Sequence, residues 1–234
     1  SSCKEFFLSK HTAKEIFLDC HETKNGLRNK IEISFFTSNK GKVQELEAIE
    51  KNNHFHKLAS SRISIKVEKS EIDVDEDQDT FIGNAIKKAN VYSLLTNNPV
   101  LTEDSGFSVP AFGKFSPDVF SARYESMYEE ELKEFVKKNK DLEKFYNEVK
   151  ASNQKDVLNK LCLIMHGYNL GFENEVLKSK FITVSVVKYK GSVFIGTGEL
   201  HGLTRIPFLQ ELTMEKLVKH LKGSGYNSIF SFAT

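Results

Sequence analysis

Two adjacent carboxylates, Glu103 and Asp104, are the side chains in this sequence best suited to chemistry. They follow the apolar pair Val100–Leu101 and precede Ser105–Gly106. Neighbouring like charges repel unless a cation lies between them or one stays protonated. Mg²⁺ is commonly held by one or two carboxylates plus substrate phosphates, and a carboxylate beside it can orient or deprotonate water. The alternative is an acidic β-turn that uses the Ser-Gly pair as turn residues.

A second group of residues is suited to binding phosphate. The stretch "TSNKGK", Thr37–Lys42, lies between an apolar run and a helical pattern, so that Lys40 or Lys42 and the N–H groups at the helix start would face an anion. It matches neither the P-loop nor G-x-G-x-x-G, and a solvated loop is the alternative. In "NAIKKA", Lys87 and Lys88 point about 100° apart on a helix, so at most one of them need face a site, and solvent exposure is the stronger alternative for Lys87.

Two other clusters have the residue types of metal ligands. The stretch "EIDVDEDQD" is strongly acidic, but counted from Asp73 an EF-hand would need Gly at Gln78 and Glu at Asn84. Taken alone, it favours a solvated acidic loop. His54 and His56 have the spacing of ligands on one strand, but without a third ligand nearby a role at the surface or the edge of the core is favoured.

The elements that must position these residues follow from apolar periodicity. "IEISFF" is typical of a buried strand, and helical spacing of apolar residues follows it. "PVLTEDSGFSVPAF" predicts a strand, a carboxylate turn and a second strand. The alternation of strands and helices predicts an α/β fold. Further predicted elements are a second strand over 62–74, helices over 79–98, 125–155, 156–167 and 214–223, and a hairpin that turns at Lys190–Gly191.

Composition narrows the class of protein. The formal net charge of the 234 residues is +1, so no global field favours nucleic acid or an anionic membrane as a partner. The three cysteines form no C-x-x-C pair, which indicates a reducing, cytoplasmic setting, and Cys162 is expected to be a core thiol. No apolar run reaches the length that spans a bilayer.

Six motifs together resemble one family. They occur in the order found in the inosine triphosphate pyrophosphatases, the Ham1-like non-canonical purine NTP pyrophosphatases. The resemblance covers roughly 31–230 and is interrupted by a highly charged stretch at about 125–155. The motifs are "FFTSNKGKVQEL", "DTFIGNAIKKA", "VLTEDSGFSV", "FSARY", "GELHGLTRIP" and "GSGYNSIF".

This resemblance implies an elongated, mixed β-sheet flanked by helices, with two lobes and a central nucleotide cleft. Residues 1–30 would be an N-terminal extension, 31–234 the α/β domain, and about 125–155 a charged helical insert. The implied activity is Mg²⁺-dependent hydrolysis of ITP, dITP or XTP to the monophosphate and pyrophosphate, which cleanses the nucleotide pool. A cytoplasmic homodimer is implied, with no nucleic-acid or membrane partner.

The resemblance also assigns roles. Asp104 matches the family's general base, and Glu76, Glu103 and Asp104 match its metal-associated positions. The matches to substrate-binding positions are Thr37, Ser38, Asn39, Lys40, Gly41, Lys42, Lys88, Ser105, Ser224, Gly225, Tyr226 and Asn227. Among these, Lys42 and Lys88 would neutralise the triphosphate.

The sequence departs from the family at the base-binding end. Ser224, Asn227 and Ser228 stand where the family's "GFGYDP" has Phe, Asp and Pro, and the later "SHR" motif is not in this sequence, which ends at Thr234. Discrimination between bases is therefore expected to weaken. Two alternatives remain: a degenerate member that binds nucleotides or a partner protein without catalysis, and an enzyme of modified pyrimidine nucleotides.

Overall fold

The computed structural model describes residues 31–37, 39–50, 63–207, 213–223 and 225–232. The predictions for residues 1–30, His54 and His56 lie outside this part of the chain. The helices and strands are β1 (Ile31–Phe36), α2 (Lys40–Glu50), β2 (Ile63–Glu68), α4 (Phe81–Tyr92), β3 (Val100–Ser108), η2 (Pro110–Phe115), η3 (Ser121–Arg123), α5 (Tyr124–Met127), α6 (Glu129–Val136), α7 (Lys140–Ala151), α8 (Lys155–Asn169), β4 (Val176–Tyr189), β5 (Ser192–Arg205), α9 (Met214–Leu221), η4 (Gly225–Ser228) and β6 (Phe230–Phe232).

The described strands form a mixed sheet in the order β2-β1-β3-β4-β5-β6. β1 pairs in parallel with β2 and with β3, while β6 pairs antiparallel with β5. Lys190 and Gly191 join β4 to β5 with φ values of 43° and 81°, and positive φ at both residues is typical of a type I′ hairpin turn. A mixed sheet flanked by helices confirms the predicted α/β class.

The predicted strand, turn and second strand over 99–112 are wrong, because a single strand ends at Ser108 and a 3-10 helix begins at Pro110. The expected turn at Ser105–Gly106 does not form, because β3 runs without interruption from Val100 to Ser108. The strand lies between β1 and β4 in the sheet, and β1 pairs with it at Val100 and Leu101. This ladder outweighs the local turn preference of a Ser-Gly pair. Glu103 and Asp104 therefore lie within a strand and not at its end.

The chain divides into two compact units. Unit 1 contains the described residues up to Asp104 together with Val184–Thr197, and unit 2 contains Ser105–Thr183 and Gly198–Thr234. In unit 1, α4 begins at Phe81 because Thr80 caps it, its hydroxyl accepting a hydrogen bond from the Gly83 N–H at 3.0 Å. The buried face of α4 packs its alanines against β4, in a small core of Ala85, Ala89, Val184 and Val186.

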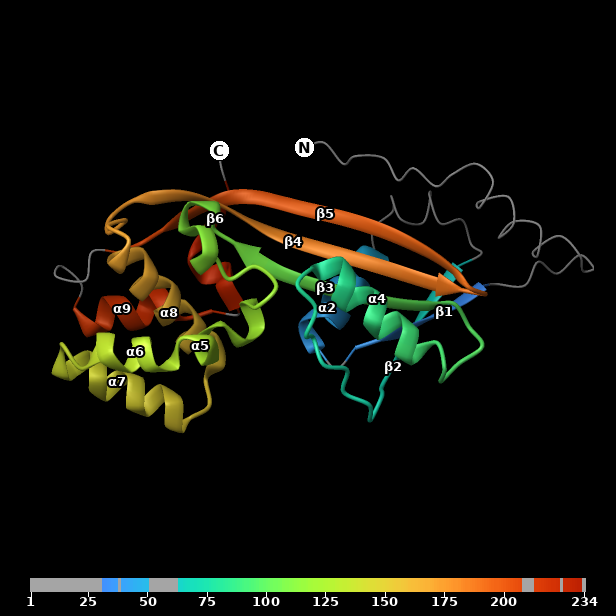
Figure 1. Ribbon diagram of the computed structural model, residues 1–234, viewed down its shortest axis with the longest axis horizontal. Coiled ribbons are helices and arrows are strands. Elements are labelled where there is room, and N and C mark those ends of the chain that lie inside the picture. Colours follow the sequence, from blue (N-terminus) through green and yellow to red (C-terminus); the bar gives the residue numbers. More distant parts are fainter. Residues whose placement is uncertain (1–30, 38, 51–62, 208–212, 224, 233–234) are drawn as a thin grey trace, which may run out of the picture. The chain divides into compact units, whose positions relative to one another are not determined.

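Unit 2 has the larger apolar core, centred on α8, whose residues from Leu158 to Gly167 are all buried. Helices α6 and α7 of the charged stretch each contact α8 (Figure 1). Their apolar faces are buried, and the exposed side of α6 and its C-terminal end carry the ion pairs Lys133–Glu130 and Lys137–Glu134. Cys162 is a buried free thiol, as predicted. In the part of the chain that the structure describes, no helix is both long and apolar enough to cross a lipid bilayer.

Candidate active site

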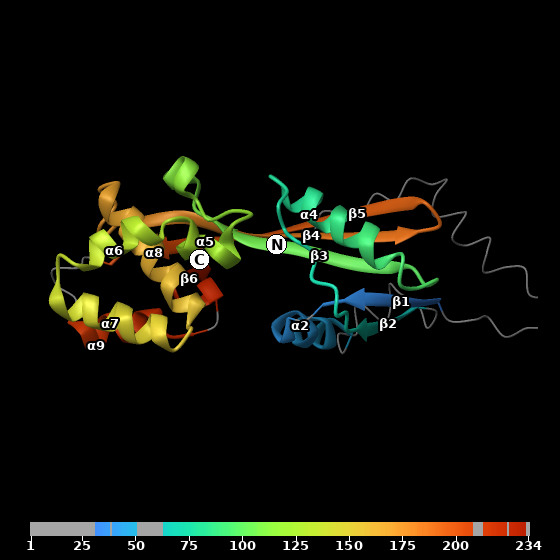
Figure 2. The ribbon, with the colours of Figure 1, turned by 60° about the horizontal axis from the view of Figure 1, so that its bottom comes forward.

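The pleat of β3 separates the two adjacent carboxylates. Successive side chains of a strand point to opposite faces. The Thr102 hydroxyl donates to the Ala85 carbonyl of α4 at 2.7 Å, and Asp104, two residues on, also faces α4. Glu103 points to the other face, where its Oε1 lies 3.3 Å from Lys42 Nζ of α2. Figure 2 shows α4 and α2 on opposite sides of β3. The like charges therefore avoid each other by geometry, with a lysine on each side.

Lys88 is the cation at the centre of the unit 1 site. Its ammonium lies 3.5 Å from Asp104 Oδ1, contacts the Glu76 carboxylate, and donates to the Glu103 carbonyl at 3.0 Å. Asp104 is almost fully buried, with a side-chain exposure of 6%, whereas Glu76 is 33% exposed. Residues from α4, from β3 and from the segment before α4 thus converge on one ammonium group.

Asn84 belongs to the same cluster, although the sequence analysis gave it no role. Its Nδ2 donates to Asp104 Oδ2 at 2.9 Å, and its Oδ1 accepts from the Gln78 N–H at 2.9 Å. The backbone N–H can only donate, so it fixes which end of the amide faces Asp104. The spacing of residues in the sequence could have indicated this role, because Asn84 and Lys88 are four residues apart and so share a helix face.

The surroundings of Asp104 act on its pKa in both directions. Burial, the largest effect, raises the pKa above its ordinary value because desolvation disfavours the charged form. The ammonium of Lys88 and the hydrogen bond from Asn84 lower the pKa, while the negative charge of Glu76 raises it. The net result is a raised pKa, which is typical of a carboxylate that accepts a proton during a reaction.

The loop that leads into α2 is organised by Asn39. The Asn39 side chain accepts hydrogen bonds from the N–H groups of Gly41 at 2.8 Å and Lys42 at 3.4 Å, and its own N–H donates to the Thr37 hydroxyl at 3.1 Å. This is the contact pattern of a helix cap. The N–H groups expected to face an anion are therefore directed at Asn39 here. Ser38 and the side chain of Lys40 lie outside the described residues.

Lys87 points away from this cluster. Its ammonium donates to the Asp75 carbonyl at 2.9 Å and pairs with Asp77 at 2.8 Å. It therefore ties the acidic segment before α4 to the helix. As a result, Glu76 lies between two residues that Lys87 holds in place.

The carboxylates of this site fit a divalent cation that arrives with its substrate. Among the described residues, no group of three or more His, Cys, Asp or Glu side chains is arranged to hold a metal ion alone. Glu76 and Asp104, however, already share one cation, the Lys88 ammonium. Mg²⁺ needs only one or two protein carboxylates when phosphates and water complete its octahedron. The donor set therefore fits Mg²⁺ bound together with a triphosphate.

The other predicted substrate residues belong to unit 2. Ser105 is half-buried in β3, and Ser224 lies outside the described residues. Tyr226 is buried, stacks on Phe107 with ring centroids 4.7 Å apart, and donates its hydroxyl to the Ser121 carbonyl at 3.1 Å. Of the rest of η4, Gly225 is half-buried and Asn227 is exposed. The structure thus brings Lys42, Glu76, Lys88, Glu103 and Asp104 together within unit 1, while the role of Tyr226 stays a prediction.

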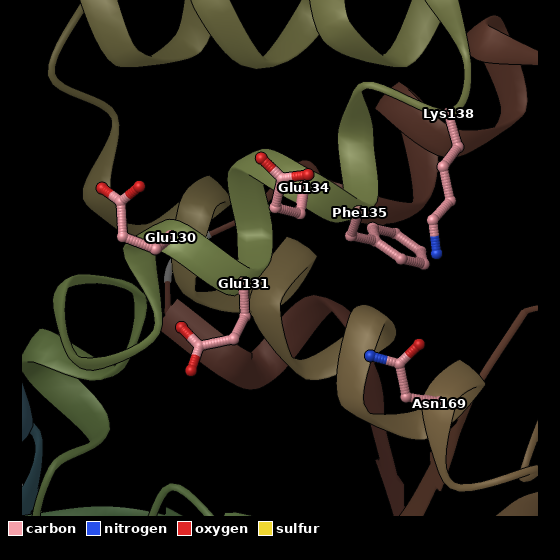
Figure 3. Close-up of a pocket in the computed structure, with 6 residues that line it drawn as sticks. All are labelled: Glu130, Glu131, Glu134, Phe135, Lys138 and Asn169. Carbon is pink, nitrogen blue, oxygen red and sulfur yellow. The ribbon is translucent and has the colours of Figure 1, made fainter.

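A surface pocket of unit 2 offers a different chemistry. Three glutamates dominate its lining, and Figure 3 shows their carboxylates around it. Negative charge repels a triphosphate, so this pocket is a poor candidate for the nucleotide site. The residues that line it are Glu130, Glu131, Glu134, Phe135, Lys138 and Asn169.

Comparison with known sequences relates this chain to one family. A sequence profile described as the Ham1 family matches residues 33–232. A dITP/XTP pyrophosphatase of Aliarcobacter butzleri (strain RM4018) is 42% identical over 100 residues, which are 40% of this chain and 46% of that protein. The chain thus spans less than half the length of this relative. A dITP/XTP pyrophosphatase of Hydrogenobaculum sp. (strain Y04AAS1) is 32% identical over 176 residues, 74% of this chain and 75% of that protein.

Solved structures are similar in fold. A HAM1 protein from Coxiella burnetii, 21% identical, matches 86% of this chain and 82% of its own with a TM-score of 0.56. The Staphylococcus aureus Ham1 protein, also 21% identical, matches 86% of this chain and 81% of its own with a TM-score of 0.52. The profile extends from β1 to β6, and the Hydrogenobaculum protein is related over most of its length. On this evidence, the chain belongs to the Ham1 family.

Proposed function

We propose that the protein is a nucleoside triphosphate pyrophosphohydrolase that converts ITP, dITP or XTP to the monophosphate and pyrophosphate. The observation that carries the proposal is the unit 1 cluster, in which Lys88 joins the carboxylates of Glu76 and Asp104. The names of the relatives, dITP/XTP pyrophosphatase, support the same reaction. Removing deaminated purine nucleotides from the pool is the biological role that follows.

The lysines provide the charge that a triphosphate requires. The ammonium of Lys88 is held by three groups, and Lys42 is held by Glu103. Each lysine is therefore oriented before substrate arrives, which reduces the entropy lost on binding. On binding, phosphate oxygens replace part of these ion pairs, and the two ammonium groups stabilise the negative charge that develops on the phosphates.

Asp104 is the residue proposed to act on the attacking water. Its carboxylate is buried, its pKa is raised, and the Asn84 amide orients one oxygen, so the other can accept a proton from water. Glu76 and Asp104, which share the Lys88 ammonium, would hold Mg²⁺, whereas Glu103, expected from the family resemblance to join them, points to the opposite face of β3 and pairs with Lys42. Such an ion, when bound, supplies positive charge to the α- and β-phosphate oxygens.

The nucleoside is proposed to contact residues of unit 2, namely Ser105, Ser224, Gly225, Tyr226 and Asn227. A cytoplasmic homodimer is proposed from the family resemblance.

Product analysis tests this proposal directly. The protein is incubated with ITP and Mg²⁺, and the products are separated by ion-exchange chromatography. IMP and pyrophosphate in equal amounts are expected, with no turnover when EDTA removes the metal. Orthophosphate as the first product, or no turnover with any nucleoside triphosphate, would contradict the proposal. A panel of purine and modified pyrimidine triphosphates distinguishes the pyrimidine alternative.

A second candidate function is nucleotide binding without efficient catalysis. Two observations favour it: Asn39 already occupies the N–H groups at the start of α2, and Glu103 already pairs with Lys42. A ligand must displace these contacts, which weakens the electrostatic advantage of the site. This function predicts that ITP raises the melting temperature while no IMP accumulates over hours.

A further inference from the structure

Lys160 on α8 is a fully buried lysine that takes no part in the unit 1 site. Its ammonium donates to the Leu221 carbonyl at 2.5 Å, to the Gly223 carbonyl at 2.9 Å and to the Ser228 hydroxyl at 3.0 Å. An ammonium has three N–H donors, and each has an acceptor here. The three acceptors lie at the last residue of α9, just after that helix, and at the last residue of η4.

A buried charge of this kind requires a compensating arrangement. Removing an ammonium from water is strongly unfavourable unless hydrogen bonds satisfy it. Leu221 is the last residue of α9, and the final carbonyls of a helix have no partner within the helix. A positive charge at this end also interacts favourably with the helix dipole. Lys160 therefore fixes the end of α9 and, through Ser228, the end of η4.

Asp156 holds the opposite end of η4. It lies one helical turn before Lys160 on α8, and its Oδ2 accepts a hydrogen bond from the Gly225 N–H at 3.4 Å. Residues four apart share a face of a helix. One face of α8 thus supplies an acceptor for the first residue of η4 and a donor for its last residue.

The segment itself is closed tightly enough to transmit this restraint. Gly223 has φ of +120°, and a Cβ there would lie 2.9 Å from the Ser228 Cβ, so only glycine fits. Inside η4, Tyr226 is anchored in the core through its ring and its hydroxyl. Asn227, next to it, remains exposed. A fixed backbone with one outward amide is suited to recognising a ligand, because a site positioned by rigid neighbours loses little entropy on binding.

We propose that Lys160, assisted by Asp156, is a positioning residue that fixes η4 and thereby sets which nucleobase the protein prefers. This inference rests on the proposed function, in which η4 contacts the nucleoside. Lys160 touches neither the phosphates nor the reacting atoms. Its loss therefore alters the relative affinity for nucleotides that differ only in the base and leaves the affinity for phosphate groups unchanged.

The test is calorimetric measurement of dissociation constants for ITP, GTP, ATP and CTP, with inorganic tripolyphosphate as a probe of the phosphate site alone. We define the spread as the ratio of the weakest to the tightest dissociation constant among the four nucleotides. Lys160→Met is expected to reduce this spread by about tenfold, the effect of losing one well-oriented hydrogen bond. Tripolyphosphate should bind as it does to the unmodified protein. Lys155→Met, an exposed lysine on the same helix, is the matched control and should change neither quantity.

Two milder variants cover the case in which Lys160→Met does not fold. Ser228→Ala removes one contact of the ammonium, and Asp156→Asn weakens the contact to Gly225; each should reduce the spread by a smaller factor. The inference would be overturned if the variants lost affinity equally for all four nucleotides and for tripolyphosphate. It would also be overturned if both milder variants kept the differences in dissociation constant among the four nucleotides, or if the unmodified protein bound all four nucleotides equally. Base-selective binding without hydrolysis would contradict the proposed function and leave this inference standing.

Discussion

At the scale of single residues, Lys88 has the largest predicted effect on substrate binding. Its ammonium contacts Glu76, Asp104 and the Glu103 carbonyl. Lys88→Met removes the charge proposed to bind phosphate and takes away the cation that Glu76 and Asp104 share, so the KM for ITP should rise by about tenfold or more. Lys87→Met is the control, because Lys87 lies on the same helix but its ammonium contacts Asp75 and Asp77 of the acidic segment. Steady-state kinetics of the two variants decide the point, and an equal KM in both would contradict it.

Asn84 gives a prediction about pH. The amide hydrogen bond stabilises the charged form of Asp104 and so lowers its pKa. Asn84→Ala should therefore raise that pKa further, moving the acid limb of the kcat profile to higher pH and lowering kcat by about tenfold near neutrality. Asn90→Ala, on the exposed side of α4, should leave the profile unchanged. If both variants give the profile of the unmodified protein, Asn84 does not act through Asp104.

The sequence predicted part of the unit 1 cluster and missed the rest for a physical reason. Lys42, Glu76, Lys88 and Asp104 could be assigned because they lie in motifs that resemble the family's, although each stretch taken alone also fits a solvated loop or helix face. Asn84 and Lys160 could not, since the role of an amide or a buried lysine depends on which groups surround it after folding. Lys160 in particular lies in "DVLNKLCLIMHG", where a lysine is ordinarily expected to reach solvent.

At the scale of elements, β3 shows how tertiary structure overrides local preference. Ser105 and Gly106 predict a turn from their own conformational tendencies, yet both lie inside a strand that has neighbours in the sheet and stays extended. The boundaries of β1 and the turn at Lys190–Gly191 were predicted correctly, because each depends on neighbouring residues alone.

The packing of α8 leads to a prediction about stability at acidic pH. His166 is buried among the rings of Phe115, Tyr124 and Tyr128, and this burial lowers its pKa to about 4 from an ordinary 6.5. The unfolded chain therefore binds a proton between these values while the folded chain does not. Above pH 6.5 this group costs the folded protein no stability. As the pH falls toward 4 the free energy of unfolding decreases, and the loss is about 2 kcal/mol at pH 5.

Urea unfolding at pH 7.5 and pH 5 measures this loss. His166→Phe keeps an aromatic ring among its neighbours but cannot take up a proton, so its stability should fall by about 2 kcal/mol less than that of the unmodified protein. Comparing the two proteins cancels the titration of all other groups. An identical loss in both would show that His166 is not the responsible group.

The pairing of β5 with β6 depends on one glycine. A Cβ at Gly202 would lie 2.2 Å from Phe230 Cζ and 2.3 Å from the Ser231 carbonyl oxygen, whereas a Cβ at Gly198 would meet nothing within 4 Å. Gly202→Ala should therefore destabilise the protein by about 1–3 kcal/mol through overpacking. Gly198→Ala, on the same strand, should change the free energy of unfolding by less than about 0.5 kcal/mol. Similar urea midpoints for both variants would contradict the description of this strand pair.

At the scale of the whole molecule, the chain has two units with separate cores. The carboxylates and lysines of the candidate site belong to unit 1, and η4 belongs to unit 2. The sequence predicted the α/β class and the helical character of the charged stretch at about 125–155, but it did not predict the division of residues between units, because three strands each continue from one unit into the other. The helices of this stretch pack on α8 through apolar residues at helical spacing, including Leu132, Val136, Leu142 and Tyr146.

The central claim, that Asp104 and its neighbours form the catalytic site of a nucleotide pyrophosphohydrolase, is tested most directly by Asp104→Asn. Calorimetry and IMP production are measured for this variant, with exposed Asp79→Asn as the matched control. The account predicts that Asp104→Asn binds ITP within about threefold of the unmodified protein but forms IMP at least about a hundredfold more slowly, the typical contribution of a general base. IMP formation by Asp104→Asn at the rate of the Asp79→Asn control would contradict it.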